Sequence, residues 1–136
     1  MTPNEEKRNK RRKQTAEVFT PPALTNEILD KLPDEVWEPM KTFCDPACGN
    51  GNMLLEVLKR KLSLNHDPLQ AISTIWGVDL MEDNIEEAKG RFLDLIPEDA
   101  HSEALEILNR QIVCHDALKW DFINWRSNEV TFKKLF

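Results

Sequence analysis

The feature that most constrains the fold is a glycine-containing loop between a short apolar segment and a helical pattern. The segment Thr42–Cys44 predicts a buried strand, and residues 53–62 carry leucines at helical spacing. Between them, Gly49 and Gly51 lack a Cβ, so the backbone can turn sharply and approach a ligand closely. The helix that follows would offer unpaired backbone N–H groups at its start. The loop therefore indicates either a ligand-binding turn between a strand and a helix or a purely structural one.

Strands and helices alternate along the rest of the chain, which predicts an α/β fold with a parallel sheet and right-handed crossovers. We expect further strands at 74–79 and 111–114, and helices capped by Thr20 and ending at Pro33, near 69–73, from Asp83 or Asn84 to Ile96, and around 104–108. Residues 120–125 show no clear period, and residues 130–136 are compatible with the beginning of a fourth strand. The prediction is a partial Rossmann-like sheet of three or four strands flanked by helices.

Two further strand ends carry acids. Asp79 ends the second expected strand, and a carboxylate there can accept both hydroxyls of a ribose. Asp116 follows the third strand, where it could accept a hydrogen bond from the exocyclic amine of an adenine, with Ala117 packing on the ring. Asp45, at the first strand end, could accept from a ligand ammonium. Together the three positions predict one nucleoside-shaped cleft, although each acid alone is also compatible with a loop or a helix cap.

Charge is distributed unevenly along the 136 residues, whose net charge is −6. Six cations and only two acids fall within the first thirteen positions, so the remainder is strongly acidic and does not attract DNA by itself. Any phosphate contact would fall largely to the six cations, Lys7, Arg8, Lys10, Arg11, Arg12 and Lys13. We expect a basic flexible arm over residues 1–16, followed by an incomplete domain over 17–136. The alternative is that the arm is only a solubilising tail.

Several classes of protein are disfavoured. The three cysteines, Cys44, Cys48 and Cys114, fit no zinc-binding spacing, so no metal site is expected. We expect them instead to be buried free thiols in a reducing compartment. No apolar run approaches the roughly 18–20 residues that span a bilayer, and the first residues are too polar for a secretory signal. A cytoplasmic protein without membrane contact is the expectation.

Four segments resemble motifs of adenine-specific (N6) DNA methyltransferases. The F-T-P element is matched by residues 19–21, the D-P-A-C-G-x-G loop by 45–51, the G-x-[DE] strand end by 77–79 and the D-A-L element by 116–118. The resemblance covers about residues 17–119. It implies that this is the amino-terminal portion of such an enzyme, which binds S-adenosylmethionine (SAM).

The resemblance also implies roles for individual residues. The F-T-P element would close over the methionine half of SAM, which the glycine loop would line. Asp79 would hold the ribose, with Leu80 against the adenine, and Asp116 and Ala117 would contact the same ring. The full implied set is Phe19, Thr20, Pro21, Asp45, Ala47, Cys48, Gly49, Gly51, Asp79, Leu80, Asp116 and Ala117.

One family motif has no counterpart. The fourth-strand [DNS]-P-P-[YFW] element, which grips the target base, does not occur, and the only Pro-Pro is Pro21-Pro22. No catalytic residue is therefore assigned. The expected function is the SAM-binding portion of an adenine-specific DNA methyltransferase that needs a partner or a missing segment for catalysis. The alternatives are a non-catalytic SAM-binding module or inactive methyltransferase-like subunit and, less favoured, a methyltransferase of another substrate. Restriction, phage and regulatory settings all stay open.

The strand order of the family adds an expectation about partners. In that order the first strand lies between the second and the fourth. If the fourth strand is missing, the strand around Phe43 becomes an open apolar edge, which invites pairing with another chain. We expect a second polypeptide or self-association at this edge.

Overall fold

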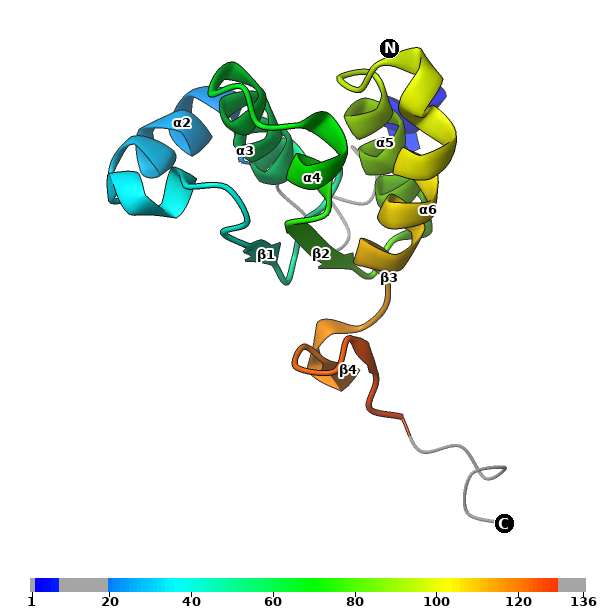
Figure 1. Cartoon of the computed structure of the whole chain (residues 1–136). Coiled ribbons are helices and arrows are strands. Elements are labelled where there is room, and N and C mark those ends of the chain that lie inside the picture. The colour runs from blue at the N-terminus through cyan, green and yellow to red at the C-terminus, as the bar shows by residue number, and fades with distance from the viewer. Residues whose placement is uncertain (1, 8–19, 130–136) are drawn as a thin grey trace.

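The computed structural model describes residues 2–7 and 20–129. Its main sheet consists of β1 (Phe43–Asp45), β2 (Ile75–Asp79) and β3 (Ile112–Cys114), all parallel and in the order β1-β2-β3. Figure 1 shows the helices gathered on one side of this sheet. The expected α/β fold with a parallel three-stranded sheet is confirmed. The possible fourth strand at 130–136 lies outside the described residues.

The helical layer packs one apolar face against the sheet. Leu58 and Phe92 are among its fully buried side chains, and Ile75 of β2 joins them in one core cluster. Residues 3–7 are also helical, which the sequence analysis did not anticipate. The helices of the layer are α2 (Pro22–Asp30), α3 (Asn52–Ser63), α4 (Pro68–Ile72), α5 (Glu82–Leu93) and α6 (His101–Gln111), with 3₁₀ turns η1 (Asp34–Trp37), η2 (Glu98–Ala100) and η3 (Ala117–Lys119).

Two expected helix caps were wrong. The N-cap of α2 is Pro21 rather than Thr20, because Pro21 is itself extended and Pro22 occupies the first turn. The N-cap of α5 is Met81 rather than Asp83 or Asn84. Asn84 instead lies buried in the helix, where its amide donates to the strand-end carboxylate of Asp79 at 3.1 Å.

The end of α6 also differs from expectation by one residue. Gln111 was expected to begin the third strand but is the last residue of α6. Its buried side-chain amide donates to the carbonyls of Ile72 at 2.9 Å and Ile75 at 2.8 Å. These bonds connect α4 and the start of β2 to α6, so the glutamine fixes how the last helix of the layer meets the sheet.

The segment without clear period forms a small hairpin of β4 (Trp120–Asp121) and β5 (Arg126–Ser127). Its turn is organised by Asp121, whose carboxylate accepts backbone N–H groups of Ile123 and Asn124 at 3.0 and 3.1 Å. The Trp125 ring lies 4.9 Å from that of Trp76 on β2. In Figure 1 the hairpin lies on the side of the sheet opposite the helices. The two faces of the sheet are therefore covered very unequally.

Two further findings concern membrane-spanning helices and metal sites. Within 2–7 and 20–129, no helix has the length and apolar character needed to cross a membrane. In the same stretch, no group of three or more His, Cys, Asp or Glu side chains is arranged to hold a metal ion.

Candidate functional site

The carboxyl ends of the three parallel strands meet at one edge of the sheet, as the sequence predicted. The register pairs Asp45 with Gly77 and Asp79 with Cys114 across neighbouring strands. A hollow of about 220 Å³ opens there, and all three strand ends contribute to it. Its lining residues are Pro46, Ala47, Asp79, Leu80, His115, Asp116 and Ala117. Five residues of the expected SAM-binding set thus line one cavity, in an open α/β sheet at the place where such sheets bind ligands.

The glycine loop turns sharply at its two glycines, as the sequence predicted. Gly49 and Gly51 have φ values of +55° and +88°, a left-handed conformation that glycine adopts without strain. Gly51 is the N-cap of α3, and a Cβ there would lie 3.1 Å from the Cβ of Ala88 on α5. The Asp45 carboxylate accepts the backbone N–H of Ala47 at 3.0 Å, which closes the beginning of the loop. Gly51 therefore serves both the turn and the close packing of α5.

Cys48 lies under the loop rather than in the hollow. Its backbone N–H donates to the carbonyl of Val78 at 2.9 Å, and its side chain belongs to the core cluster. Burial, with the nearby carboxylates of Asp79 and Asp45, raises the pKa of the thiol. Cys48 therefore acts as a small apolar residue, and its contact with a ligand would be indirect.

Gly77 is a residue whose structural role the sequence analysis did not identify. A Cβ at this position would lie 2.9 Å from Leu54 Cδ1 and 3.0 Å from both Cβ and Sγ of Cys48. The glycine thus lets the loop and α3 approach β2 closely. The signal was present in the G-x-[DE] pattern, but only the structure shows which groups occupy the space of the missing side chain.

We predict that Gly77→Ala lowers the free energy of unfolding by about 1–3 kcal/mol, because overpacking displaces the loop or Leu54. Urea denaturation measures this change. The matched control is Gly90→Ala in α5, where an added Cβ meets nothing within 4 Å. Alanine should there stabilise the helix by about 0.5–1 kcal/mol. Equal effects of the two substitutions would contradict the packing argument.

Asp79 is the centre of the site's hydrogen bonding. Its Oδ1 accepts the backbone N–H of Gly49 at 3.1 Å, and its Oδ2 accepts from the Met81 N–H at 3.0 Å and from the Asn84 amide at 3.1 Å. Its backbone carbonyl accepts the N–H of His115 at 2.9 Å. One residue therefore joins the glycine loop, the start of α5 and the end of β3. A carboxylate has about four lone-pair sites, so with three in use it retains capacity for a ligand hydroxyl.

The acids of the site give it a negative character. Burial raises the pKa of the Asp45 carboxyl; the Ala47 N–H opposes that shift and the neighbouring Asp79 carboxylate reinforces it. Asp45 lies beside the hollow without lining it, whereas Asp116 lines it and accepts the Leu118 N–H on Oδ1 at 3.0 Å. Ligand and cap roles are thus compatible for Asp116. A cationic ligand group would relieve the unfavourable burial of the Asp45 charge.

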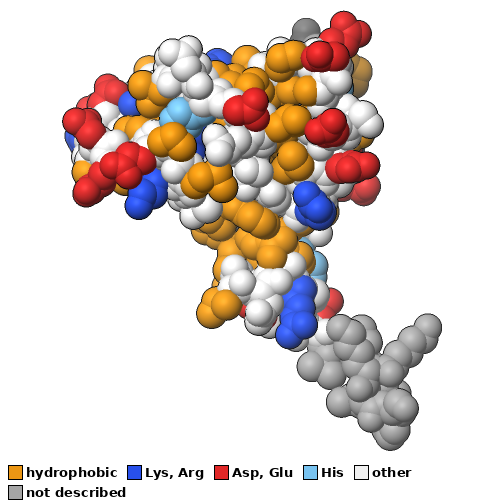
Figure 2. All heavy atoms as spheres, in the orientation of Figure 1, with side chains coloured by type: hydrophobic (Ala, Val, Ile, Leu, Met, Phe, Trp, Pro, Cys, Tyr) orange, Lys and Arg blue, Asp and Glu red, His pale blue; other side chains and the backbone are white. Residues whose placement is uncertain are grey.

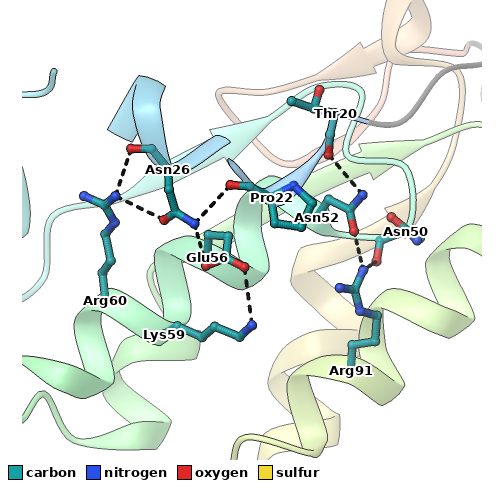
Figure 3. A network of polar contacts seen from close by, with 9 residues as sticks. All are labelled: Thr20, Pro22, Asn26, Asn50, Asn52, Glu56, Lys59, Arg60 and Arg91. Carbon is teal, nitrogen blue, oxygen red and sulfur yellow. Dashed lines mark hydrogen bonds and ion pairs between the residues drawn. The ribbon is translucent and has the colours of Figure 1, made fainter. Parts of the chain in front are cut away.

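The amino-terminal element is only partly described. Phe19 lies outside the described residues, whereas Thr20 is half-buried and Pro21 is exposed. The carbonyl of Thr20 accepts a hydrogen bond from the amide of Asn52, the first residue of α3, at 3.2 Å. Figure 3 shows this contact within a wider polar network beside the glycine loop. Thr20 is thus held next to the loop, although it does not line the hollow.

Most of the predicted DNA-contacting arm lies outside the described residues. Lys7 is exposed, and the other five cations of the arm, Arg8, Lys10, Arg11, Arg12 and Lys13, lie outside the described residues. The phosphate-binding interpretation of the arm therefore stays a prediction.

Comparison with known proteins decides the family. A family model described as N-6 DNA Methylase matches residues 5–93. The chain belongs to this family. The matched range includes the amino-terminal element, the glycine loop and Asp79, and ends before Asp116.

A curated relative agrees. The Type II methyltransferase M.VspI of Vibrio sp. (strain 343) is 34% identical over 77 residues, which are 57% of this chain and 16% of that protein. The chain thus corresponds to about a sixth of the length of this relative. No solved structure matches the chain.

Proposed function

We propose that this chain binds SAM in the strand-end hollow and is the SAM-binding portion of an adenine-specific DNA methyltransferase. The observation that carries the proposal is the position of Asp79, which lines the hollow while its carboxylate joins the glycine loop to α5. Members of the N-6 DNA Methylase family use SAM in general. The residues lining the hollow fit a nucleoside: a carboxylate for the ribose, and the apolar side chains of Leu80 and Ala117 for the ring.

Different residues of the chain would bind different parts of SAM. SAM supplies the methyl group on a sulfonium sulfur, and the chain holds it in place. Asp79 accepts a ribose hydroxyl, and Asp116 accepts from the adenine amine. The half-buried carboxylate of Asp45 complements the positive charges of the methionine half. No residue among the 136 is assigned to the target adenine.

Methyl transfer itself also requires a motif that holds the target adenine, and the 136 residues contain no such motif. The adenine amine is a poor nucleophile because its lone pair is delocalised into the ring. Alignment of amine, methyl and sulfur is worth an effective molarity of about 10⁵ M or more, and SAM binding alone does not supply it. We therefore expect this polypeptide to act on DNA only together with residues that hold the flipped base. The basic arm would contribute phosphate contacts.

Calorimetry and a methyl-transfer assay test the proposal. We expect the purified chain to bind SAM with one site, and to transfer no detectable labelled methyl group to unmethylated DNA by itself. Absence of SAM binding would overturn the cofactor assignment. Efficient transfer would show that the missing motif is not required.

A non-catalytic SAM-binding module is the second candidate. The observation that favours it is that no [DNS]-P-P-[YFW] sequence occurs in the 136 residues. Adding a polypeptide that carries the missing motif discriminates the two. Restored methyl transfer favours the enzyme portion, and SAM binding without transfer favours the module.

The proposal extends to association with another polypeptide or a second copy at the open β1 edge of the sheet and the adjoining face that carries the hairpin. β1 is a terminal strand of the described sheet. On the face with the hairpin, hollows of about 390 and 270 Å³ lie against Trp76 and Trp125. Leu118 and Ile123 are 93% and 94% exposed. Figure 2 shows hydrophobic side chains gathered where the helical layer meets the hairpin, and acidic side chains over the helical layer.

Light scattering after gel filtration would separate the two forms of association. A mass of twice 15.8 kDa indicates a second copy. A monomer that forms a complex with the added polypeptide indicates a partner. Because exposed apolar patches drive association, Ile123→Asp should weaken either complex by about tenfold. A monomer that binds neither would contradict the proposal.

A further inference from the structure

A short relay of hydrogen bonds connects α5 to the amino-terminal element. The Arg91 guanidinium donates to the carbonyl of Asn50 at 3.2 Å and to Asn52 Oδ1 at 2.6 Å. Asn52 Nδ2 then donates to the carbonyl of Thr20 at 3.2 Å. Figure 3 shows the three segments meeting at these side chains. Residues far apart in the sequence are thus fixed to one another beside the glycine loop.

The donor and acceptor groups of the relay fix the orientation of the Asn52 side-chain amide. A guanidinium carries only donors and stays protonated in proteins, so it must face the oxygen of the Asn52 amide. The nitrogen of the same amide is then turned toward the Thr20 carbonyl. Burial lowers the pKa of Arg91, and the carboxylate of Glu56 opposes that shift. Arg91 therefore determines which end of the Asn52 side chain meets the amino-terminal element.

Packing holds the arginine within reach of the loop. A Cβ at Gly51 would lie 3.1 Å from Ala88 Cβ and 3.7 Å from the ring of Phe92. These two residues flank Arg91 on the helix, one turn before it and next to it. The close approach of α5 to the loop thus places the guanidinium against the Asn50 carbonyl.

We propose that Arg91 and Asn52 are positioning residues that hold Thr20 beside the glycine loop, next to the methionine half of SAM. The inference rests on the proposed SAM site. Neither residue lines the strand-end hollow, so each acts through the backbone of Thr20 and of the loop. The adenosine half of the ligand is held by other residues, chiefly Asp79. Loss of the relay should therefore weaken contacts to one half of the ligand only.

Calorimetry with two ligands tests this division. Arg91→Met is expected to weaken SAM binding about tenfold, because Thr20 is then no longer held beside the loop and must be ordered on binding, at about the cost of fixing one backbone residue. Affinity for 5′-methylthioadenosine, which lacks the amino-acid half, should stay within about twofold. The matched control is Lys89→Met, on the same helix, whose ammonium contacts only Glu86 and Asn109 among the described groups. It should leave both affinities unchanged.

A milder variant covers the case in which Arg91→Met fails to fold. Asn52→Ala removes the contact with Thr20 and leaves the bond from Arg91 to the Asn50 carbonyl. It should give the same selective loss, and where Arg91→Met folds, the double variant should lose no more than Arg91→Met alone. Equal weakening of both ligands, or of neither, would overturn the inference while the SAM site stands. A wild-type chain that binds neither ligand removes the SAM site and the inference together.

Discussion

Asp79→Ala is expected to weaken SAM binding by about 100-fold or more. The substitution removes the ribose acceptor and also leaves the N–H groups of Gly49 and Met81 without their carboxylate partner. The lost ribose bond costs about 1–3 kcal/mol, and displacement of the glycine loop that Asp79 no longer holds adds a second loss of similar size, which together correspond to a factor of about 100. Calorimetric titration of SAM into the wild-type and variant chains measures the change.

Two further variants separate charge from connectivity. Asp79→Asn keeps one side-chain oxygen but has lost the charge, and we expect an intermediate loss of affinity. Asp94→Ala, at the exposed C-cap of α5, removes an acid away from the hollow and should leave SAM affinity unchanged. If the dissociation constant of Asp79→Ala equals that of the wild type, Asp79 is not part of the cofactor site.

The strand ends were predictable because their signals are local. A short apolar run, an acid or glycine loop and a helical pattern follow one another within a few residues, and the parallel order then brings their ends to one edge. Ala47, Asp79 and Asp116 accordingly line one hollow. What the pattern could not show is that Asp79 already holds Gly49 and Asn84. Those contacts depend on how α5 packs, which is a tertiary property.

The hairpin and the polar relay were not predictable for a related reason. The hairpin has strands of two residues, too short for a detectable period, and it is ordered by contacts such as that of Trp125 with Trp76. Arg91 belongs to an amphipathic helix, where sequence patterns place charged residues in solvent. Its spacing of three from Ala88 was the available signal, since that puts it beside the packed face.

Lys61 is a second charged helix residue whose contacts depend on tertiary packing, and it lies at the opposite end of the sheet. It stands seven residues after Leu54 and three after Leu58, a core-facing position of α3, and its side chain is fully buried. Its ammonium donates to the carbonyl of Lys41 at 2.7 Å and to Thr74 Oγ1 at 2.8 Å. It thereby joins the segments that lead into β1 and β2, far from the strand-end hollow.

Lys61→Ala is therefore expected to lower the free energy of unfolding by about 3 kcal/mol, while leaving SAM affinity of the folded chain unchanged. The loss combines a cavity where the stem packed with two unpaired acceptors. The control is Lys59→Ala on the same helix, a half-exposed side chain that pairs with Glu56 among the described residues. Its effect should be within about 0.5 kcal/mol, as for other surface ion pairs. Urea denaturation measures both changes.

The pH dependence of stability provides an independent check on Lys61. Burial lowers the pKa of its ammonium below the ordinary value of 10.5. Between the lowered value and 10.5 the unfolded chain binds more protons than the folded one, so the free energy of unfolding should rise with pH through this window. Lys61→Met keeps the stem but cannot titrate, and its stability should lack this rise. Because all other groups titrate alike in both chains, the difference between them isolates Lys61, and parallel curves would mean that its ammonium titrates as it does in water.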